Sequence, residues 1–109
     1  MRPIASEHDV QVMLEHAARE PVILYKHSAT CPISAHANKQ MEQLAETLPV
    51  YRVVVQDQRQ LSTQLAEQLA VRHHTPQAIV VYHGEARADL SHGSVTAETL
   101  QTAVNAVLE

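Results

Sequence analysis

The stretch Ser28-Ala29-Thr30-Cys31-Pro32-Ile33-Ser34 joins an apolar run over residues 21–25 to an amphipathic segment over residues 32–48. The apolar run is rich in strand-forming residues and begins with a proline, a pattern typical of a central strand covered on both faces. In the segment that follows, apolar residues recur every three or four positions, which predicts a helix. The only cysteine of the chain, Cys31, therefore stands where a strand ends and a helix begins.

A thiol at the start of a helix is favoured as a thiolate. The first backbone amides of a helix have no partner within it, and their partial positive charge stabilises a negative sulfur. We therefore expect the pKa of Cys31 to lie below the free value of about 8.5. An inert buried cysteine is the alternative, but such a residue is more typical of a strand or an apolar helix face. With a single thiol, any disulfide that the chain forms is intermolecular.

The composition narrows the class of protein. The chain has 109 residues, 45% of them hydrophobic, and a formal net charge of −4, which together predict one domain over residues 1–109. The scattered Lys and Arg residues form no basic stripe, and three tyrosines leave little for base stacking, so we expect no nucleic acid partner. No apolar run approaches the roughly 20 residues of a membrane span, and the first residues lack a secretory apolar core. We therefore expect a cytoplasmic protein with no membrane partner.

The spacing of apolar residues, together with capping and turn residues, predicts alternating helices and strands along the chain. Helices are predicted from the Ser6 cap to about Arg19, over 32–48, over about 61–69 and after the Thr96 cap, and strands over 21–25, 50–55, 78–82 and 86–90. The order is α-βαβα-ββ-α, and the last two strands form an antiparallel hairpin. Because a βαβ crossover makes its strands parallel, we expect an α/β fold with a central four-stranded mixed sheet and helices on both faces.

The order of elements, the position of the cysteine, and Thr75-Pro76 immediately before the third strand resemble the thioredoxin fold. A narrower resemblance is to the monothiol bacilliredoxins, small thioredoxin-like proteins of the bacillithiol redox system. The segments that carry it are Tyr25–Ser28, Thr30–Ser34, Val71–Gln77 and Ser91–Gly93. The departures are mild: His74 stands where an acidic residue is expected, and Thr75 where serine is more usual.

This resemblance implies a glutaredoxin-like thiol-disulfide oxidoreductase that removes bacillithiol from S-bacillithiolated proteins, with bacillithiol as thiol co-substrate and no metal. The Cys31 thiolate attacks the mixed disulfide, releases the protein thiol and keeps bacillithiol, which a second bacillithiol then removes. In dithiol relatives a second cysteine follows three residues after the first. Ser34 stands at that position here, so the reductant must come from outside. The alternative is a non-catalytic redox-sensing or binding module that is modified at Cys31.

Several residues are candidates for supporting the thiolate or binding the substrate. Ser34 shares a helix face with Cys31 and either donates a hydrogen bond to the thiolate or is a tolerated polar residue. Lys26 and His27 end the first strand and stabilise the thiolate by charge if they point inward, whereas such residues more often face solvent. The candidates are Thr30, Pro32, Ser34, Lys26 and His27 around the thiolate, and Thr75, Pro76, His74 and Gly93 around the substrate.

Prolines and glycine carry further expectations. The resemblance implies that the Thr75-Pro76 bond is cis and faces the thiol, where its backbone pairs with an extended substrate, while an ordinary trans proline is the alternative. Pro32 suits the first helical turn and stiffens it. Gly93 is expected to supply a tight turn before the last helix, with a ligand contact of its backbone as a secondary role.

Eight histidines raise the question of a metal site with Cys31. Their spacing argues against one, because His36 points to a different helix face and the neighbouring side chains of His73 and His74 point apart. Related monothiol glutaredoxins hold an iron–sulfur cluster between two subunits, so a shared cluster is the remaining metal alternative.

Overall fold

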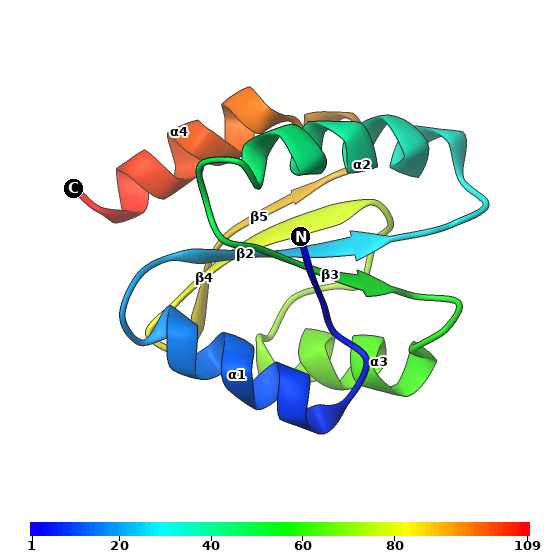
Figure 1. The fold of residues 1–109 in the computed structure, drawn as a ribbon, viewed down its shortest axis with the longest axis horizontal. Coiled ribbons are helices and arrows are strands. Elements are labelled where there is room, and N and C mark those ends of the chain that lie inside the picture. Colours follow the sequence, from blue (N-terminus) through cyan, green and yellow to red (C-terminus); the bar gives the residue numbers. More distant parts are fainter.

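The computed structural model describes residues 1–109 as a five-stranded mixed sheet with two helices on each face (Figure 1). The elements along the chain are β1 (Arg2–Pro3), α1 (Glu7–Ala17), β2 (Val22–His27), α2 (Pro32–Leu44), β3 (Val50–Val54), α3 (Arg59–Gln68), β4 (Gln77–Tyr82), β5 (Glu85–Ser91), the 3₁₀ turn η1 (His92–Ser94) and α4 (Ala97–Val107). The strand order is β1-β3-β2-β4-β5. β3 is parallel to β1 and β2, whereas β4 is antiparallel to β2 and β5. The predicted α/β class and mixed sheet are confirmed.

The prediction of four strands is wrong by one. Arg2 and Pro3 form an edge strand that pairs in parallel with Tyr51 and Arg52 of β3. Two residues are too few for an alternating pattern, and a proline is tolerated at an edge because it has no N–H to donate. A strand of this kind leaves no signal in the sequence.

The boundaries of β2 and α2 also differ from the prediction. β2 continues through Lys26 and His27, which pair with Val53 and Val54 of the neighbouring strand. The strand was predicted to end at residue 25 because Lys26 and His27 are not apolar, but the backbone pairing continues through both residues. α2 ends at Leu44 rather than at residue 48, and the chain continues in turns up to Pro49.

Apolar residues fill a core layer on each face of the sheet. α1 and α3 cover one face, and α2 and α4 cover the other (Figure 1). The α1 and α3 layer contains Ile4, Val10, Met13, Ala17, Val22, Leu24, Tyr51, Val53, Leu65, Leu69, Ile79 and Val81. The α2 and α4 layer contains Ile23, Tyr25, Ala37, Met41, Leu44, Val50, Ala78, Val80, Val95, Leu100 and Val104. Successive residues of β2 alternate between these layers, as expected for a strand covered on both faces.

The predicted helix caps are present. The Ser6 hydroxyl accepts a hydrogen bond from Asp9 N–H at 3.2 Å at the start of α1. At the start of α4, Thr96 and Thr99 form a reciprocal capping box. Such caps satisfy helix amides that have no partner inside the helix and stabilise each helix by about 1 kcal/mol.

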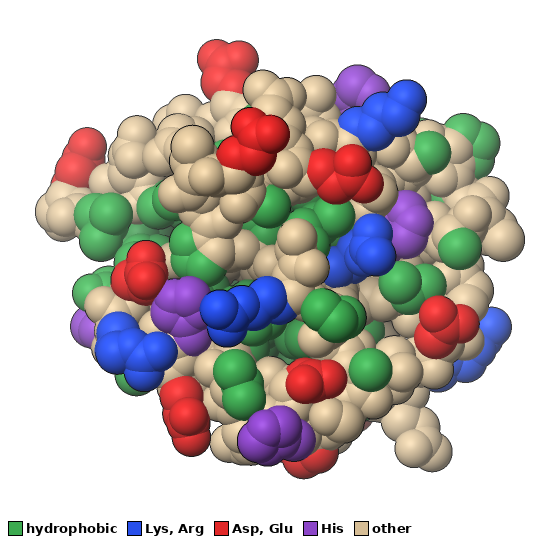
Figure 2. Space-filling model, viewed as in Figure 1, with side chains coloured by type: hydrophobic (Ala, Val, Ile, Leu, Met, Phe, Trp, Pro, Cys, Tyr) green, Lys and Arg blue, Asp and Glu red, His purple; other side chains and the backbone are tan.

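The surface mixes charges of both signs. Figure 2 shows acidic and basic side chains interspersed on one face of the molecule. None of the helices combines the length and the apolar character that crossing a membrane requires.

Candidate active site

Cys31 is the N-cap residue of α2, with extended backbone angles and a partly exposed side chain. Its carbonyl accepts the first hydrogen bond of the helix, from Ala35 N–H at 3.1 Å. Pro32 occupies the first turn, where a missing N–H leaves no helical bond unmade. The predicted position of the thiol, between a strand and a helix, is confirmed.

Backbone amides of α2 lower the pKa of the Cys31 thiol below its ordinary value. The largest cause is a hydrogen bond from the Ser34 backbone N–H, with smaller contributions from the Ile33 N–H and the Ser34 hydroxyl, while partial desolvation acts in the opposite direction. The free amides of a helix start stabilise a thiolate in this way. The expected direction of the pKa shift is confirmed, and the Ser34 hydroxyl is a minor contributor to it.

A buried tyrosine supports the first turn of α2. Tyr25 is fully buried, and its hydroxyl donates a hydrogen bond to the Ser34 carbonyl oxygen at 3.0 Å. The Ser34 side chain is also fully buried, and its hydroxyl accepts a hydrogen bond from Ser28 N–H at 3.4 Å. Ser34, whose amide lowers the thiol pKa most, is therefore held in place through both its carbonyl and its hydroxyl.

His27 lies beside this tyrosine, with its Nδ1 2.8 Å from the Tyr25 hydroxyl. Burial lowers the pKa of His27, and the Arg52 guanidinium adds to this shift, so the imidazole is neutral at neutral pH. Burial also raises the pKa of the Tyr25 phenol, which therefore remains a hydrogen-bond donor. That His27 stabilises the thiolate by its charge stays a prediction, and the lowered pKa argues against it because the surroundings disfavour the charged form.

Tyr25 was not among the predicted site residues. The signal that identifies it is the period of the strand: residues two apart in a strand share a face, so Tyr25 and His27 both face α2. A buried tyrosine hydroxyl also requires a polar partner, which the first turn of the neighbouring helix supplies.

Lys26 points to the opposite face of β2, toward α3. Its fully buried side chain donates hydrogen bonds from Nζ to His73 Nδ1 at 2.8 Å and to the Ser62 carbonyl oxygen at 3.2 Å. Successive strand residues point to opposite faces, so Lys26 cannot share the side of its two neighbours. The alternative that Lys26 faces solvent is therefore wrong; the side chain points inward, but it is held toward α3 rather than toward α2.

Gln56 forms hydrogen bonds to the loop before Cys31, and it was not among the predicted site residues. Its side-chain oxygen accepts a hydrogen bond from Ala29 N–H at 3.1 Å, and its Nε2 donates to the Ser28 hydroxyl at 2.8 Å. A longer contact of 3.4 Å joins the same nitrogen to the Thr30 hydroxyl. Thr30 is thus placed in the loop network rather than against the sulfur. No local pattern marks this contact, because Gln56 follows β3 and is distant from the loop in sequence.

The Thr75-Pro76 bond is cis, as expected. The Gln77 side chain is fully buried and fixes this segment, since its Nε2 donates to the Arg72 carbonyl oxygen and to the Asp89 carboxylate, each at 2.7 Å. The Pro76 carbonyl accepts a hydrogen bond from His92 N–H at 2.9 Å, which joins the segment to η1.

Gly93 lies in the 3₁₀ turn η1, so the expected tight turn is present. The left-handed residue of this turn is His92, with a φ of 54°, rather than the glycine. The His74 ring packs edge-on against the His92 ring at a centroid distance of 5.3 Å, so His74 lies beside the turn that contains Gly93. No group of three or more His, Cys, Asp or Glu side chains converges in a way that would hold a metal ion.

The fold and this site define a thioredoxin-fold oxidoreductase with one cysteine at the start of a helix. A family model described as "Monothiol bacilliredoxin BrxC" matches residues 2–100. The chain belongs to the monothiol bacilliredoxin family.

Solved structures of similar fold are thioredoxin-like. One described as a proposed oxidoreductase with a thioredoxin fold is 31% identical, with a TM-score of 0.84 over 94% of this chain and 91% of that chain. Thioredoxin f from spinach chloroplast is 16% identical, with a TM-score of 0.76 over 99% of this chain and 93% of that one. A Fasciola hepatica thioredoxin is 15% identical, with a TM-score of 0.75 over 97% and 98% of the two chains. The two thioredoxins support the fold alone.

Proposed function

We propose that this protein removes bacillithiol from S-bacillithiolated proteins, with Cys31 as the nucleophile. The observation that carries the proposal is the position of Cys31 at the N-cap of α2, where the Ser34 and Ile33 amides favour the thiolate. Membership of the bacilliredoxin family supports bacillithiol as the small thiol. A reducing compartment such as the cytoplasm suits this chemistry, because it keeps a lone thiol reduced.

The proposed reaction consists of two thiol–disulfide exchanges. The Cys31 thiolate attacks the bacillithiol sulfur of the mixed disulfide, a bond forms between Cys31 and bacillithiol, and the modified protein leaves as its thiolate. The thiolate of a second bacillithiol then attacks the sulfur of the Cys31-bound bacillithiol. Bacillithiol disulfide leaves, and the Cys31 thiolate is restored. The electrons for the net reduction come from bacillithiol, because the chain holds no second thiol, and exchange of this kind requires no metal.

The segment around the cis bond is the proposed contact for the modified protein. The backbone N–H and C=O of Thr75 make no hydrogen bond within the chain, so both are free to pair with an extended segment. Pro76, His74 and Gly93 border the same place through the η1 contacts. Ile33, which is 50% exposed next to the thiol, offers an apolar contact for a protein surface.

Intact-mass analysis tests the first exchange. The reduced protein is mixed with bacillithiol disulfide or with glutathione disulfide, and a Cys31→Ser variant serves as control. We expect a single bacillithiol adduct on the wild-type protein, none on the variant, and a slower reaction with glutathione disulfide. The absence of a bacillithiol adduct would overturn the proposal.

A turnover assay then separates an enzyme from a sensor. An S-bacillithiolated protein is incubated with excess bacillithiol and a small amount of the wild-type chain. We expect repeated release of the substrate thiol, lost completely in Cys31→Ser. An adduct that forms on Cys31 without repeated release would instead identify a redox-sensing module.

A further inference from the structure

A polar pocket of about 500 Å³ opens beside the loop that carries Cys31. It lies where the ends of β2 and β3 meet the first turns of α3 and the segment before the cis bond. The lining residues are Ser28, Val55, Gln56, Arg59, Ser62, Thr63, His73 and Thr75. Only Val55 is apolar, and the volume lies in the range of small-molecule sites. The two exchange steps proposed above use none of these side chains.

The pocket is joined to the thiol on two sides. Ser28, on one wall, accepts a hydrogen bond from Cys31 N–H through its carbonyl at 3.4 Å. Gln56, on the same wall, contacts the hydroxyl of Thr30, the residue before the cysteine, at 3.4 Å. Thr75, which also lines the pocket, precedes the cis proline. The loop that carries the thiol therefore borders the pocket.

Arg59 gives the rim of the pocket an unpaired positive charge. Its guanidinium forms no ion pair or hydrogen bond with another side chain, whereas the ion pairs of the chain involve His16 and Arg87. No Asp or Glu is among the lining residues. Because a guanidinium presents a planar fork of donors, it is suited to bind a carboxylate with two hydrogen bonds.

A second positive charge lies beneath the pocket. The buried Lys26 ammonium donates hydrogen bonds to His73 and to the Ser62 carbonyl, and both of these residues line the pocket. Burial lowers the pKa of Lys26 to about 8, and the Asp89 carboxylate opposes this shift, so the ammonium remains largely protonated at neutral pH. That carboxylate is held by the Gln77 amide at 2.7 Å. Lys26 thus adds a buried positive charge next to two lining residues, partly offset by Asp89, and no carboxylate lines the pocket itself.

We propose that this pocket binds the carboxylate-bearing part of the small thiol whose sulfur exchanges with Cys31, with Arg59 as the main anion-binding residue. The inference rests on the proposed function, since it assumes that a small thiol occupies Cys31. The Ser28, Ser62, Thr63 and Thr75 hydroxyls then serve polar groups of the same molecule, such as the sugar hydroxyls of bacillithiol, whose malyl group supplies the carboxylates.

The test measures binding without thiol exchange. S-methyl bacillithiol, which has no free thiol, is titrated into the ¹⁵N-labelled wild-type chain and into three variants, Arg59→Gln, Arg59→Lys and Arg19→Gln. Arg19 is exposed just after α1 and does not line this pocket, so its variant removes the same charge elsewhere. We expect amide shifts at Gln56, Arg59 and Thr63, an increase in Kd of about tenfold or more in Arg59→Gln, a partial recovery in Arg59→Lys, and no change in Arg19→Gln. The methyl diester of the ligand should bind equally weakly to the wild-type chain and to Arg59→Gln.

The outcomes separate this inference from the proposed function. Equal affinities of Arg59→Gln and Arg19→Gln, amide shifts away from the pocket, or no binding would overturn the pocket assignment, whatever the turnover assay shows. Binding that depends on Arg59, without turnover of an S-bacillithiolated protein by the wild-type chain, would support the pocket and overturn the enzymatic proposal.

Discussion

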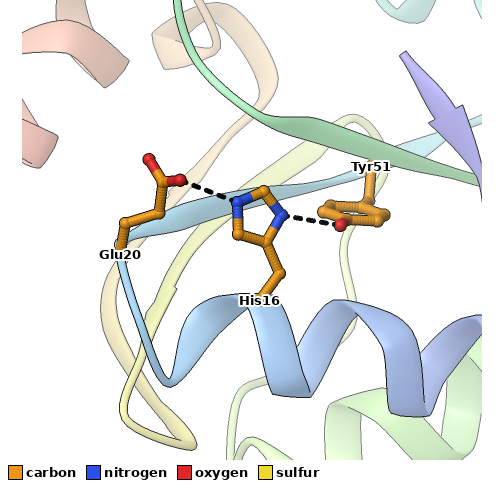
Figure 3. A network of polar contacts seen from close by, with 3 residues as sticks. All are labelled: His16, Glu20 and Tyr51. Carbon is orange, nitrogen blue, oxygen red and sulfur yellow. Dashed lines mark hydrogen bonds and ion pairs between the residues drawn. The ribbon is translucent and has the colours of Figure 1, made fainter.

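Two tyrosines on neighbouring strands of the sheet each contact a histidine through the hydroxyl, and only one of them also contacts the helix that Cys31 caps. In the first, the Tyr51 hydroxyl lies 2.8 Å from His16 Nδ1 (Figure 3). In the second, the Tyr25 hydroxyl lies 2.8 Å from His27 Nδ1. The end of α1 that carries His16 lies at the end of the sheet away from the connection between β2 and α2 (Figure 1).

The pairs differ in their third partner. The second nitrogen of the His16 ring contacts the Glu20 carboxylate at 2.9 Å. Because Tyr51 belongs to β3, this pair links the end of α1 to β3 (Figure 3). The Tyr25 hydroxyl instead donates to the Ser34 carbonyl in the first turn of α2. The same side-chain pair therefore stabilises a helix end in one place and positions the helix that controls a thiol in the other.

Removing the Tyr25 or the Tyr51 hydroxyl should show the difference between the two pairs most clearly. We expect Tyr25→Phe to lower the free energy of unfolding by about 1–3 kcal/mol, because it leaves buried polar partners unsatisfied. It should also raise the pKa of Cys31 and slow its alkylation at neutral pH, because the Ser34 amide is no longer held in place. Tyr51→Phe should cost about 1 kcal/mol and leave the alkylation rate unchanged.

Urea unfolding and iodoacetamide kinetics across pH measure these two effects. Each phenylalanine variant is the control for the other, since both lose one hydroxyl that contacts a histidine. An alkylation profile that is equally shifted in both variants would show that Tyr25 has no special connection to the thiol.

The pH dependence of stability sharpens the comparison further. The pKa of His27 is lowered by burial, so an unfolded chain takes up a proton at this residue near pH 6.5 while the folded chain does not. The stability that neutral His27 provides is thus present above about pH 6.5 and is lost as the pH falls through the lower pKa of the folded state. We expect part of the acid destabilisation of the wild-type chain to disappear in His27→Gln.

The free energy of unfolding at pH 7.5 and at pH 5.5 is the quantity to compare. The pKa of His73 is also lowered, by burial and by Lys26, so some acid destabilisation should remain. His8→Gln, at an exposed position of α1, is the matched control. If the wild-type chain and His27→Gln lose the same free energy between the two pH values, His27 is not the group responsible.

Local signals were sufficient to predict the position of the thiol. The apolar run before Cys31, Pro32 after it and the spacing of the following apolar residues all act within a few residues, and each predicted the correct element. The Ser6 and Thr96 caps were predicted for the same reason.

The contacts that tune the thiol were harder to predict, because they join residues far apart in the chain. Lys26 and His73 are 47 residues apart, and Gln56 and Ser28 are 28 apart. Period-two alternation indicates which face of the sheet a side chain occupies, but the partner on that face is known only when the helices are packed. The sequence therefore left open what the Lys26 charge contacts, and its partners His73 and Ser62 are evident only in the packed structure.

The smallest expected effect concerns the Ser34 hydroxyl, and it tests whether backbone or side chain controls the thiol. The hydroxyl is the last of the groups that lower the pKa of Cys31, after the Ser34 and Ile33 backbone amides. Ser34→Ala keeps both amides and the carbonyl that Tyr25 holds, and it removes a weak acceptor for Ser28 N–H together with the minor contribution of the hydroxyl to the thiol pKa. We therefore expect the pH profile of alkylation to move to higher pH by less than in Tyr25→Phe. A larger shift in Ser34→Ala would assign the control of the thiol to the hydroxyl and reduce Tyr25 to a structural role like that of Tyr51.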